Sequence, residues 1–154
     1  MHEEQHVIFK IGSESYGINI NYVKAIEKEY KIIPVPNAPA NIKGMINLRG
    51  EIIPIYSLRT RFKMQDTQME KRQLLIVNLG EESIAYEVDS LVGIQTIQPE
   101  QVHDVPVILQ SDETGYIGNI LSFGTEVVVD LSCEKMLTTE ERHAIHQMME
   151  ENTQ

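Results

Sequence analysis

The chain has 154 residues, of which 42% are hydrophobic, enough for one domain with a packed core. Its formal charge of −10 argues against the basic surface that binds nucleic acid or anionic membranes. The apolar runs are too short to span a bilayer, and the opening MHEEQHVIFK does not resemble a secretory signal. The single cysteine, Cys133, excludes a disulfide framework and a cysteine-based zinc site. These features predict a cytoplasmic protein.

The first half of the chain is predicted to form short strands, because β-branched and aromatic residues alternate with turn-forming Gly, Ser, Asn and Pro. The expected extended segments are residues 6–11, 16–20, 30–35, 43–48 and 51–56. Asn21 is predicted to cap a short helical turn that places Val23 and Ile26 on one side. One further helical turn is expected over residues 57–62.

The second half shows the same pattern and ends in a helix. The expected strands are residues 73–79, 84–88, 93–97, 116–123 and 126–131. Asp89 is predicted to cap the turn DSLVG, and residues 98–115 to form a long polar loop. A helical turn at 132–137 precedes Thr138 and Glu141, whose spacing indicates a capping box for a helix over about residues 139–151. About ten short strands at close spacing predict an all-β fold of small barrels.

An internal repeat relates the two halves by a shift of 68 residues. Residues 8–26 align with residues 76–94, including a turn glycine and the residues predicted as caps, Asn21 and Asp89. Further along, Gly44 and Gly50 fall on Gly118 and Gly124, and residues 55–58 fall on 128–131. The repeat predicts two similar subdomains, about residues 6–65 and 72–137, between which strands can be exchanged. A groove between two such barrels would suit an elongated partner, such as a helix.

Two sets of residues are candidate chemical centres. His143 and His146 lie three apart on the expected helix, but no third metal ligand is marked, so surface histidines are favoured. Cys133 is interpreted as a small buried residue, because no histidine base or oxyanion site accompanies it. We therefore expect no metal and no cofactor at these residues.

Two other patterns also lack a chemical role. Gly44 and Gly50 are not followed by the Lys and Ser or Thr of a phosphate-binding loop. Asp89 and Asp130 are interpreted as caps rather than as a catalytic carboxylate pair. The sequence therefore predicts a binding module and not an enzyme.

Residues 37–62, NAPANIKGMINLRGEIIPIYSLRTRF, resemble the hallmark segment of CheW-type chemotaxis coupling proteins. The segments VIFKIGSESYGINI, IAYEVDSLVGI and YIGNILSFGTEVVVDLSCEKML resemble the same family, so that the resemblance covers about residues 6–137. It implies a single CheW-like domain over residues 1–154. The implied fold is all-β, with two five-stranded SH3-like barrels in pseudo-two-fold relation, short helical turns and a C-terminal helix.

The resemblance also implies a function as a non-enzymatic chemotaxis adaptor. The implied partners are the regulatory domain of the histidine kinase CheA and the cytoplasmic tip of a chemoreceptor, a methyl-accepting chemotaxis protein. Such a protein is cytoplasmic and is recruited to membrane receptor arrays without inserting into the membrane. The alternatives are a paralogous adaptor for another receptor–kinase array and, less favoured, a small-molecule or metal-binding β-barrel.

The resemblance can be carried onto individual residues. For the receptor-binding groove it implies Val23, Ile26, Ile33, Arg49 and Val88, although core packing is an equally good interpretation of the apolar ones. For kinase binding or for the structure of the hairpin it implies Gly44, Arg49 and Gly50.

The chain departs from the family pattern at two positions. Many members carry a glutamate where this chain has Ala25, and that glutamate can pair with the hairpin arginine. Here Glu27 and Glu51 are the candidate partners of Arg49. Many members also have an aspartate at the position of Ser57, which can still cap the following turn.

Pro54 interrupts the second strand of the hairpin. Because proline has no N–H to donate, it predicts a barrel edge or a bulge where strand pairing lapses. An edge of this kind would be open to a partner.

Overall fold

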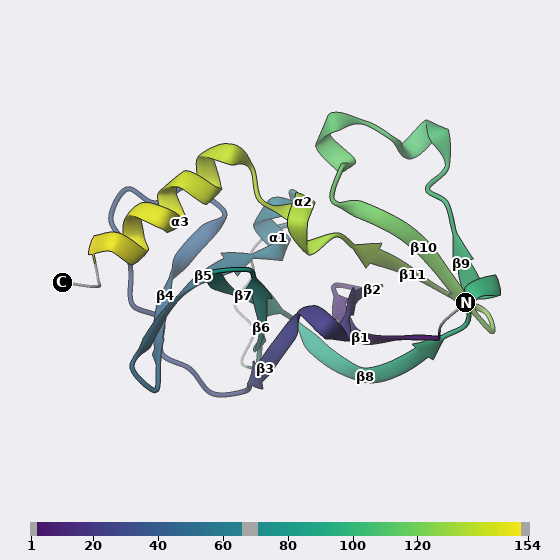
Figure 1. Ribbon diagram of the computed structural model, residues 1–154, viewed down its shortest axis with the longest axis horizontal. Coiled ribbons are helices and arrows are strands. Elements are labelled where there is room, and N and C mark those ends of the chain that lie inside the picture. Colours follow the sequence, from purple (N-terminus) through teal and green to yellow (C-terminus); the bar gives the residue numbers. More distant parts are fainter. Residues whose placement is uncertain (1–2, 66–70, 152–154) are drawn as a thin grey trace.

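The computed structural model describes residues 3–65 and 71–151, which form two β-sheets and a C-terminal helix (Figure 1). The strands of the first half are β1 (Glu4–Ile11), β2 (Glu14–Asn19), β3 (Val23–Glu27), β4 (Ile42–Leu48) and β5 (Glu51–Ser57). Those of the second half are β6 (Gln73–Leu79), β7 (Glu82–Val88), β8 (Ser90–Ile97), β9 (Val102–His103), β10 (Ile117–Phe123) and β11 (Glu126–Leu131). The α-helices are α1 (Leu58–Arg61), α2 (Cys133–Met136) and α3 (Thr139–Glu151). The 3₁₀ turns are η1 (Ile20–Tyr22), η2 (Pro99–Gln101), η3 (Val107–Leu109) and η4 (Asp112–Thr114).

Each sheet contains strands from both halves of the repeat. One sheet has the order β8-β1-β2-β11-β10-β9, and the other has the order β3-β6-β7-β5-β4. The hairpins β1–β2 and β6–β7 are therefore exchanged, and each is joined to its host sheet by a parallel pairing, β2 with β11 and β7 with β5. The repeat matches the two sheets strand for strand, with β8-β1-β2-β11-β10 corresponding to β3-β6-β7-β5-β4, and only β9 has no counterpart. The predicted all-β fold of two related barrel subdomains is confirmed.

The largest hydrophobic cluster lies between the two sheets. Because successive side chains of a strand point to opposite faces, β1 directs Ile8 into one barrel and Val7 and Phe9 into the central cluster. In the same way, β6 directs Leu74 into the other barrel and Leu75 into the centre. The two barrels consequently share their main core and pack as one body.

The C-terminal helix is fixed to the sheet β3-β6-β7-β5-β4 by one buried carboxylate. Glu141 accepts hydrogen bonds from Tyr56 Oη (2.8 Å), Asn41 Nδ2 (2.7 Å) and the Thr138 N–H (2.9 Å). The last of these, with the Glu141 N–H donating to Thr138 Oγ1 (3.1 Å), forms the predicted capping box. The helix buries Ile145 against the central cluster. None of the described helices is long and apolar enough to cross a membrane.

Three of the predicted caps, Asn21, Asp89 and Asp130, are wrong. Asn19, not Asn21, caps the turn η1, because its Oδ1 accepts the Asn21 N–H at 2.9 Å. The turn ends at Tyr22, and Val23 and Ile26 lie on strand β3, where they pair with β6. Asp89 caps nothing, since the residues after it form strand β8.

Asp130 is not a cap either. It lies within strand β11, and its Oδ1 is 3.2 Å from Nε2 of the buried His6. The capping prediction for Ser57 is confirmed, because its hydroxyl accepts the Thr60 N–H at the start of α1. The loop expected to be polar, residues 98–115, instead exposes Val107 and Ile108, whose exposed fractions are 82% and 91%.

Candidate protein-interaction surface

The hairpin β4–β5 turns on two residues with positive φ. Arg49 has φ 51° and Gly50 has φ 90°, while Leu48 and Glu51 face each other across the ladder. Positive φ at both central positions is the type I′ arrangement, which matches the twist of paired strands. The turn is further fixed by the Gly50 N–H, which donates to Asn47 Oδ1 at 2.9 Å. A residue with a Cβ is disfavoured at the position of Arg49, so the backbone does not explain the arginine.

Two ion pairs connect this hairpin to strand β3. Arg49 Nη2 lies 3.7 Å from Glu27 Oε1, and Lys24 Nζ lies 3.1 Å from both carboxylate oxygens of Glu51. Of the two candidate partners, Glu27 pairs with Arg49 and Glu51 pairs with Lys24. Strands β3 and β4 are the two edges of their sheet. Both ion pairs therefore bridge the gap between the two edges, where the barrel is not closed by strand pairing.

A hollow of about 250 Å³ lies beside the Arg49–Glu27 pair. It is lined by Glu27, Glu29, Tyr30, Lys31, Ile33, Ile46, Asn47 and Leu48. The hollow has an aliphatic floor and a charged rim, and it is smaller than the usual pocket for a small molecule. Its size and composition suit one or two side chains of a protein partner.

Gly44 allows a loop to approach the edge of β4 and thereby helps to shape this hollow. A Cβ at Gly44 would lie 2.6 Å from the backbone oxygen of Ile33, and the register of β4 with β5 shifts between Ile42 and Gly44. Next to it, Ile33 and Met45 exchange backbone hydrogen bonds of 2.8 and 2.9 Å. The close approach places Ile33, 36% exposed, at the hollow.

Pro54 marks a lapse in strand pairing but not an edge. It is buried in β5, an inner strand, and faces Met45 of β4. The parallel pairing of β5 with β7 begins only at Ile55, so the missing N–H of Pro54 costs no ladder bond there. The expectation that a partner docks at this proline is therefore wrong, since the residue is not accessible.

The apolar residues implied for the receptor groove are not equally accessible. Val23 and Ile26 are half-buried on β3, where they pack against the central cluster. Val88 is only 1% exposed and belongs to that cluster, so its side chain cannot contact a partner here.

Strand β8 carries exposed residues that were not predicted from the sequence. Val92 and Ile94 are 57% and 59% exposed, whereas Leu91 packs against the central cluster as Val23 does. The shift of 68 places Val23 on Leu91 and Ile26 on Ile94, so the repeat could have indicated Ile94; Val92 falls on Lys24, and the repeat gives no signal for it. The strands β3 and β8 therefore present two equivalent apolar positions in the two sheets, Val23 with Leu91 and Ile26 with Ile94.

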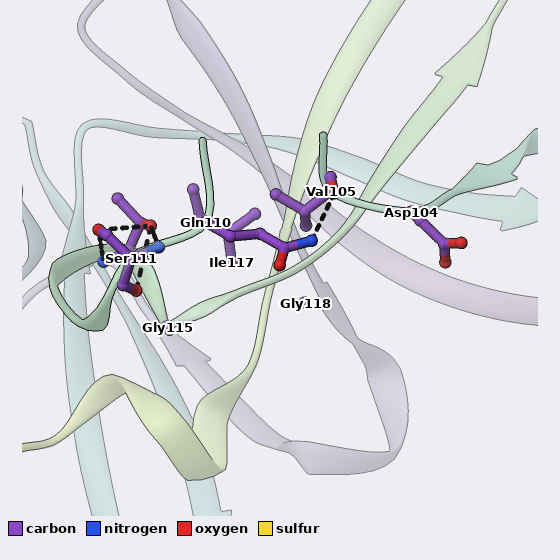
Figure 2. Close-up of a pocket in the computed structure, with 8 residues that line it drawn as sticks. Asp104, Val105, Gln110, Ser111, Gly115, Ile117 and Gly118 are labelled. Carbon is purple, nitrogen blue, oxygen red and sulfur yellow. Dashed lines mark hydrogen bonds between the residues drawn. The ribbon is translucent and has the colours of Figure 1, made fainter. Parts of the chain in front are cut away.

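A second hollow, of about 430 Å³, lies beside the loop that precedes β10 (Figure 2). It is lined by Asp104, Val105, Gln110, Ser111, Thr114, Gly115, Ile117 and Gly118. Gln110 Nε2 donates to the Val105 carbonyl at 2.9 Å, and Ser111 and Thr114 bond to each other. The polar side chains thus serve to order the loop.

The two candidate chemical centres have ordinary structural environments. Burial and the nearby charges of Asp130 and Glu134 raise the pKa of the Cys133 thiol to about 12, so this residue stays protonated. Hydrogen bonding to Glu82 and the charge of Glu150 raise the pKa of the exposed His146, which lies 3.1 Å from each carboxylate. Within residues 3–65 and 71–151, no three ligand-type side chains are placed to bind a metal ion.

A buried ionic network was not predicted from the sequence. Glu87 accepts from Lys43 Nζ (2.8 Å), Tyr30 Oη (2.8 Å) and Arg72 Nη1 (3.1 Å). Both Glu87 and the neighbouring Asp89 are buried, with exposed fractions of 5% and 6%. Two carboxylates, Glu87 and Asp89, in the otherwise apolar segment IAYEVD were the available signal, since only paired charges are buried.

Asp89 shares Arg72 with Glu87, since Arg72 Nε lies 3.9 Å from Asp89 Oδ1, but the hydrogen bonds of Asp89 come from other donors. Arg59 holds it with two bonds, from Nε at 2.9 Å and from Nη2 at 2.6 Å, and the Gly12 N–H donates to Oδ2 at 2.7 Å. Burial alone would raise the pKa of Asp89, but these bonds and the charges of Arg59 and Arg72 lower it below its ordinary value.

The fold and these surfaces define a two-barrel β domain whose exposed features suit the binding of proteins. The chain belongs to the family of CheW-like domains, whose model matches residues 5–141. It is 31% identical to the chemotaxis protein CheW of Treponema pallidum over 142 residues, which cover 89% of this chain and 84% of that protein. It is also 31% identical to the chemotaxis protein CheW of Klebsiella aerogenes, over 90% of this chain and 84% of that protein.

A solved structure shares the fold. The scaffolding protein TtCheW from Thermoanaerobacter tengcongensis superimposes with a TM-score of 0.83 at 23% sequence identity. The match covers 91% of this chain and 96% of that one. The recognised resemblance and the two-barrel architecture are therefore confirmed.

Proposed function

We propose that this protein is a non-enzymatic chemotaxis adaptor that couples a transmembrane chemoreceptor to the regulatory domain of the histidine kinase CheA. Membership of the CheW-like family and the names of the relatives support this proposal. The observation that carries it is the pair of equivalent strands β3 and β8, which offer apolar side chains on either side of the shared core. The adaptor acts in the cytoplasm and is recruited to receptor arrays through this binding.

The receptor's cytoplasmic tip is assigned to the surface formed by β3 and β8. Its contacts would be Val23 and Ile26 on one strand and Val92 and Ile94 on the other. All four are aliphatic and are partly or largely accessible. An elongated helical partner can contact two strands that belong to different sheets, and aliphatic contacts suit the apolar face of an amphipathic helix.

The kinase regulatory domain is assigned to the open end of the barrel around Arg49. The hollow next to the Arg49–Glu27 pair combines an aliphatic floor with a charged rim. This pattern, apolar in the centre and polar at the border, is usual for protein interfaces. Assigning the partners to separate surfaces allows both to bind at once.

The test is a binding measurement with each partner alone. Isothermal titration of the protein with a receptor-tip fragment and with the isolated kinase regulatory domain should give dissociation constants of tens of micromolar or tighter, about −6 kcal/mol or better. The double variant Val92→Asp/Ile94→Asp should weaken receptor binding about tenfold or more and spare kinase binding. Val107→Asp, which alters an exposed valine away from both surfaces, is the matched control.

Two results would contradict the proposal. If the wild-type protein bound neither partner at this concentration, the adaptor function would be wrong. If the β8 double variant bound the receptor fragment as tightly as the Val107→Asp control, the assignment of the receptor surface would be wrong.

A further inference from the structure

Asp89 lies at the point where the chain passes from one sheet to the other. It is the one residue between β7, in the sheet β3-β6-β7-β5-β4, and β8, in the sheet β8-β1-β2-β11-β10-β9. The chain therefore leaves one barrel and enters the other at this residue. The strand that begins directly after it carries Val92 and Ile94, the exposed apolar residues assigned above to the receptor surface.

The contacts of Asp89 tie both barrels to this crossing point. Its N–H donates to the Lys10 carbonyl at 3.1 Å, and its Oδ2 accepts the Gly12 N–H at 2.7 Å, so it is bound twice to the β1–β2 hairpin. On the other side, Arg59 of α1, which directly follows β5, holds the carboxylate with two bonds. A bidentate arginine–carboxylate pair fixes orientation as well as distance.

The other crossing between the sheets, from β2 to β3, has no buried carboxylate–guanidinium pair among the described residues. Its tie to the helix α2 is an exposed hydrogen bond, from Tyr22 Oη to Glu134 Oε1 at 3.0 Å. There the repeat places Asn21 at the position of Asp89, and Asn21 is exposed, with its N–H bonded to Asn19 of the same turn. Ser57 and Ser132 are the N-cap residues of α1 and α2, so Glu134 occupies the position that corresponds to Arg59. The carboxylate–guanidinium pair is thus present in only one half of an otherwise repeated architecture. Because the other half folds in the same way without it, the pair is not required to form this fold.

We propose that Asp89, held by Arg59 and by the Gly12 N–H, is a positioning residue that sets the orientation of β8 relative to β3. This inference rests on the proposed function, because the two strands are the two parts of the proposed receptor surface. The affinity of a partner that contacts both strands depends on their relative orientation. The affinity of a partner that docks at the end of one barrel does not depend on it.

Glu87 provides a matched control. It is a buried carboxylate two residues away, and the hydrogen bonds that it accepts come from Tyr30, Lys43 and Arg72. Lys43 lies on β4, and Arg72 directly precedes β6, both in the barrel to which β7 itself belongs. Arg72 Nε also lies 3.9 Å from Asp89 Oδ1, but Arg59 and the Gly12 N–H bond Asp89 directly. Loss of the Glu87 charge should therefore lower stability without releasing the crossing point.

The experiment measures barrel orientation and binding in the same proteins. Residual dipolar couplings, recorded by NMR on the full chain, report the relative orientation of the two sheets in the wild type, Asp89→Asn, Arg59→Lys and Glu87→Gln. We expect an altered or averaged orientation in Asp89→Asn and Arg59→Lys, and the wild-type orientation in Glu87→Gln. Receptor-fragment affinity should fall about tenfold in the first two variants, while kinase-domain affinity is retained.

Three results would overturn the inference. They are an unchanged orientation in the Asp89→Asn and Arg59→Lys variants, an equal loss of affinity for both partners, and an effect of Glu87→Gln as large as that of Asp89→Asn. Arg59→Lys keeps the positive charge and removes only the fork geometry, so it provides the test if Asp89→Asn does not fold. If the wild type bound neither partner, the proposed function would fail, but the couplings would still decide whether Asp89 sets the orientation.

Discussion

Arg49 and Glu27 form an ion pair, with 3.7 Å between Nη2 and Oε1, across the gap between the two edge strands of one sheet. The pair adds little to stability, because Arg49 is 79% exposed and exposed pairs contribute about 0–1 kcal/mol. At the same time, the positive φ of Arg49 costs about 1–2 kcal/mol relative to a residue without a Cβ. Stability therefore does not explain why an arginine occupies this turn, and we expect its role to lie in partner binding.

Replacement of Arg49 by asparagine should separate the two effects. Asparagine tolerates positive φ and is preferred before glycine in type I′ turns, so Arg49→Asn should raise the free energy of unfolding by about 0.5–1 kcal/mol. The same change should weaken binding of the kinase regulatory domain. Urea denaturation and isothermal titration of the variant measure these two quantities.

Glu27→Ala is the control for this variant, because it removes the ion pair and keeps the guanidinium. Weaker binding in both variants would mean that Glu27 orients the arginine for its partner. If Arg49→Asn lowered the free energy of unfolding by more than about 1 kcal/mol, the arginine would have a structural role instead.

Gly44→Ala should be among the most damaging single changes in the chain. The added methyl group would lie 2.6 Å from the Ile33 oxygen and 2.7 Å from the Ile32 side chain, so the loop would have to leave the edge of β4. We expect a loss of about 3 kcal/mol or more in the free energy of unfolding. Gly80→Ala is the control, because its φ of 84° is also unfavourable but the space around it is open. That control should cost about 1 kcal/mol, and equal losses in the two variants would exclude the steric explanation.

Glu141→Ala should release the C-terminal helix from the barrel. The change leaves Tyr56 Oη, Asn41 Nδ2 and the Thr138 N–H without the carboxylate that accepts their hydrogen bonds. Because each unpaired buried group costs about 1–3 kcal/mol, a total loss of about 3 kcal/mol is expected. Hydrogen exchange of the amides in α3 should accelerate more than that of the amides in β6. The neighbouring exposed Glu140 provides the control variant Glu140→Ala, which should leave exchange nearly unchanged.

The elements that the sequence predicted well depend on local interactions. The Thr138–Glu141 capping box and the Ser57 cap are bonds between residues three apart, so sequence spacing is enough to find them. The β-hairpins were found for the same reason. The repeat added the relation between the halves, because turn glycines and apolar positions recur with one shift.

The elements that the sequence missed depend on distant partners. Asn21 and Asp89 precede similar apolar segments, and a local cap was a reasonable prediction for both. In the structure, Asp89 instead binds Gly12, 77 residues away, and Arg59, 30 residues away. The sequence also could not show that Val88 is buried and Val92 exposed. The difference arises because the chain changes sheets between these two residues, and Val92 then lies on an exposed part of β8. Exposure at these positions follows from topology and not from residue type.

The stability that Asp89 provides should depend on pH in a defined direction. The pKa of Asp89 is lowered in the folded protein, so its contribution is fully present above the unfolded value of about 4 and is lost as pH falls through the folded value. At pH 7, Asp89→Asn should lower the free energy of unfolding by about 3–5 kcal/mol, because it breaks a largely buried, bidentate ion pair. Below pH 4 the wild type should lose stability more steeply than the variant, and the difference between them should shrink. Urea denaturation of both proteins at intervals from pH 7 to pH 2 measures this difference, and a gap that stays constant with pH would show that the charge of Asp89 does not stabilise the fold.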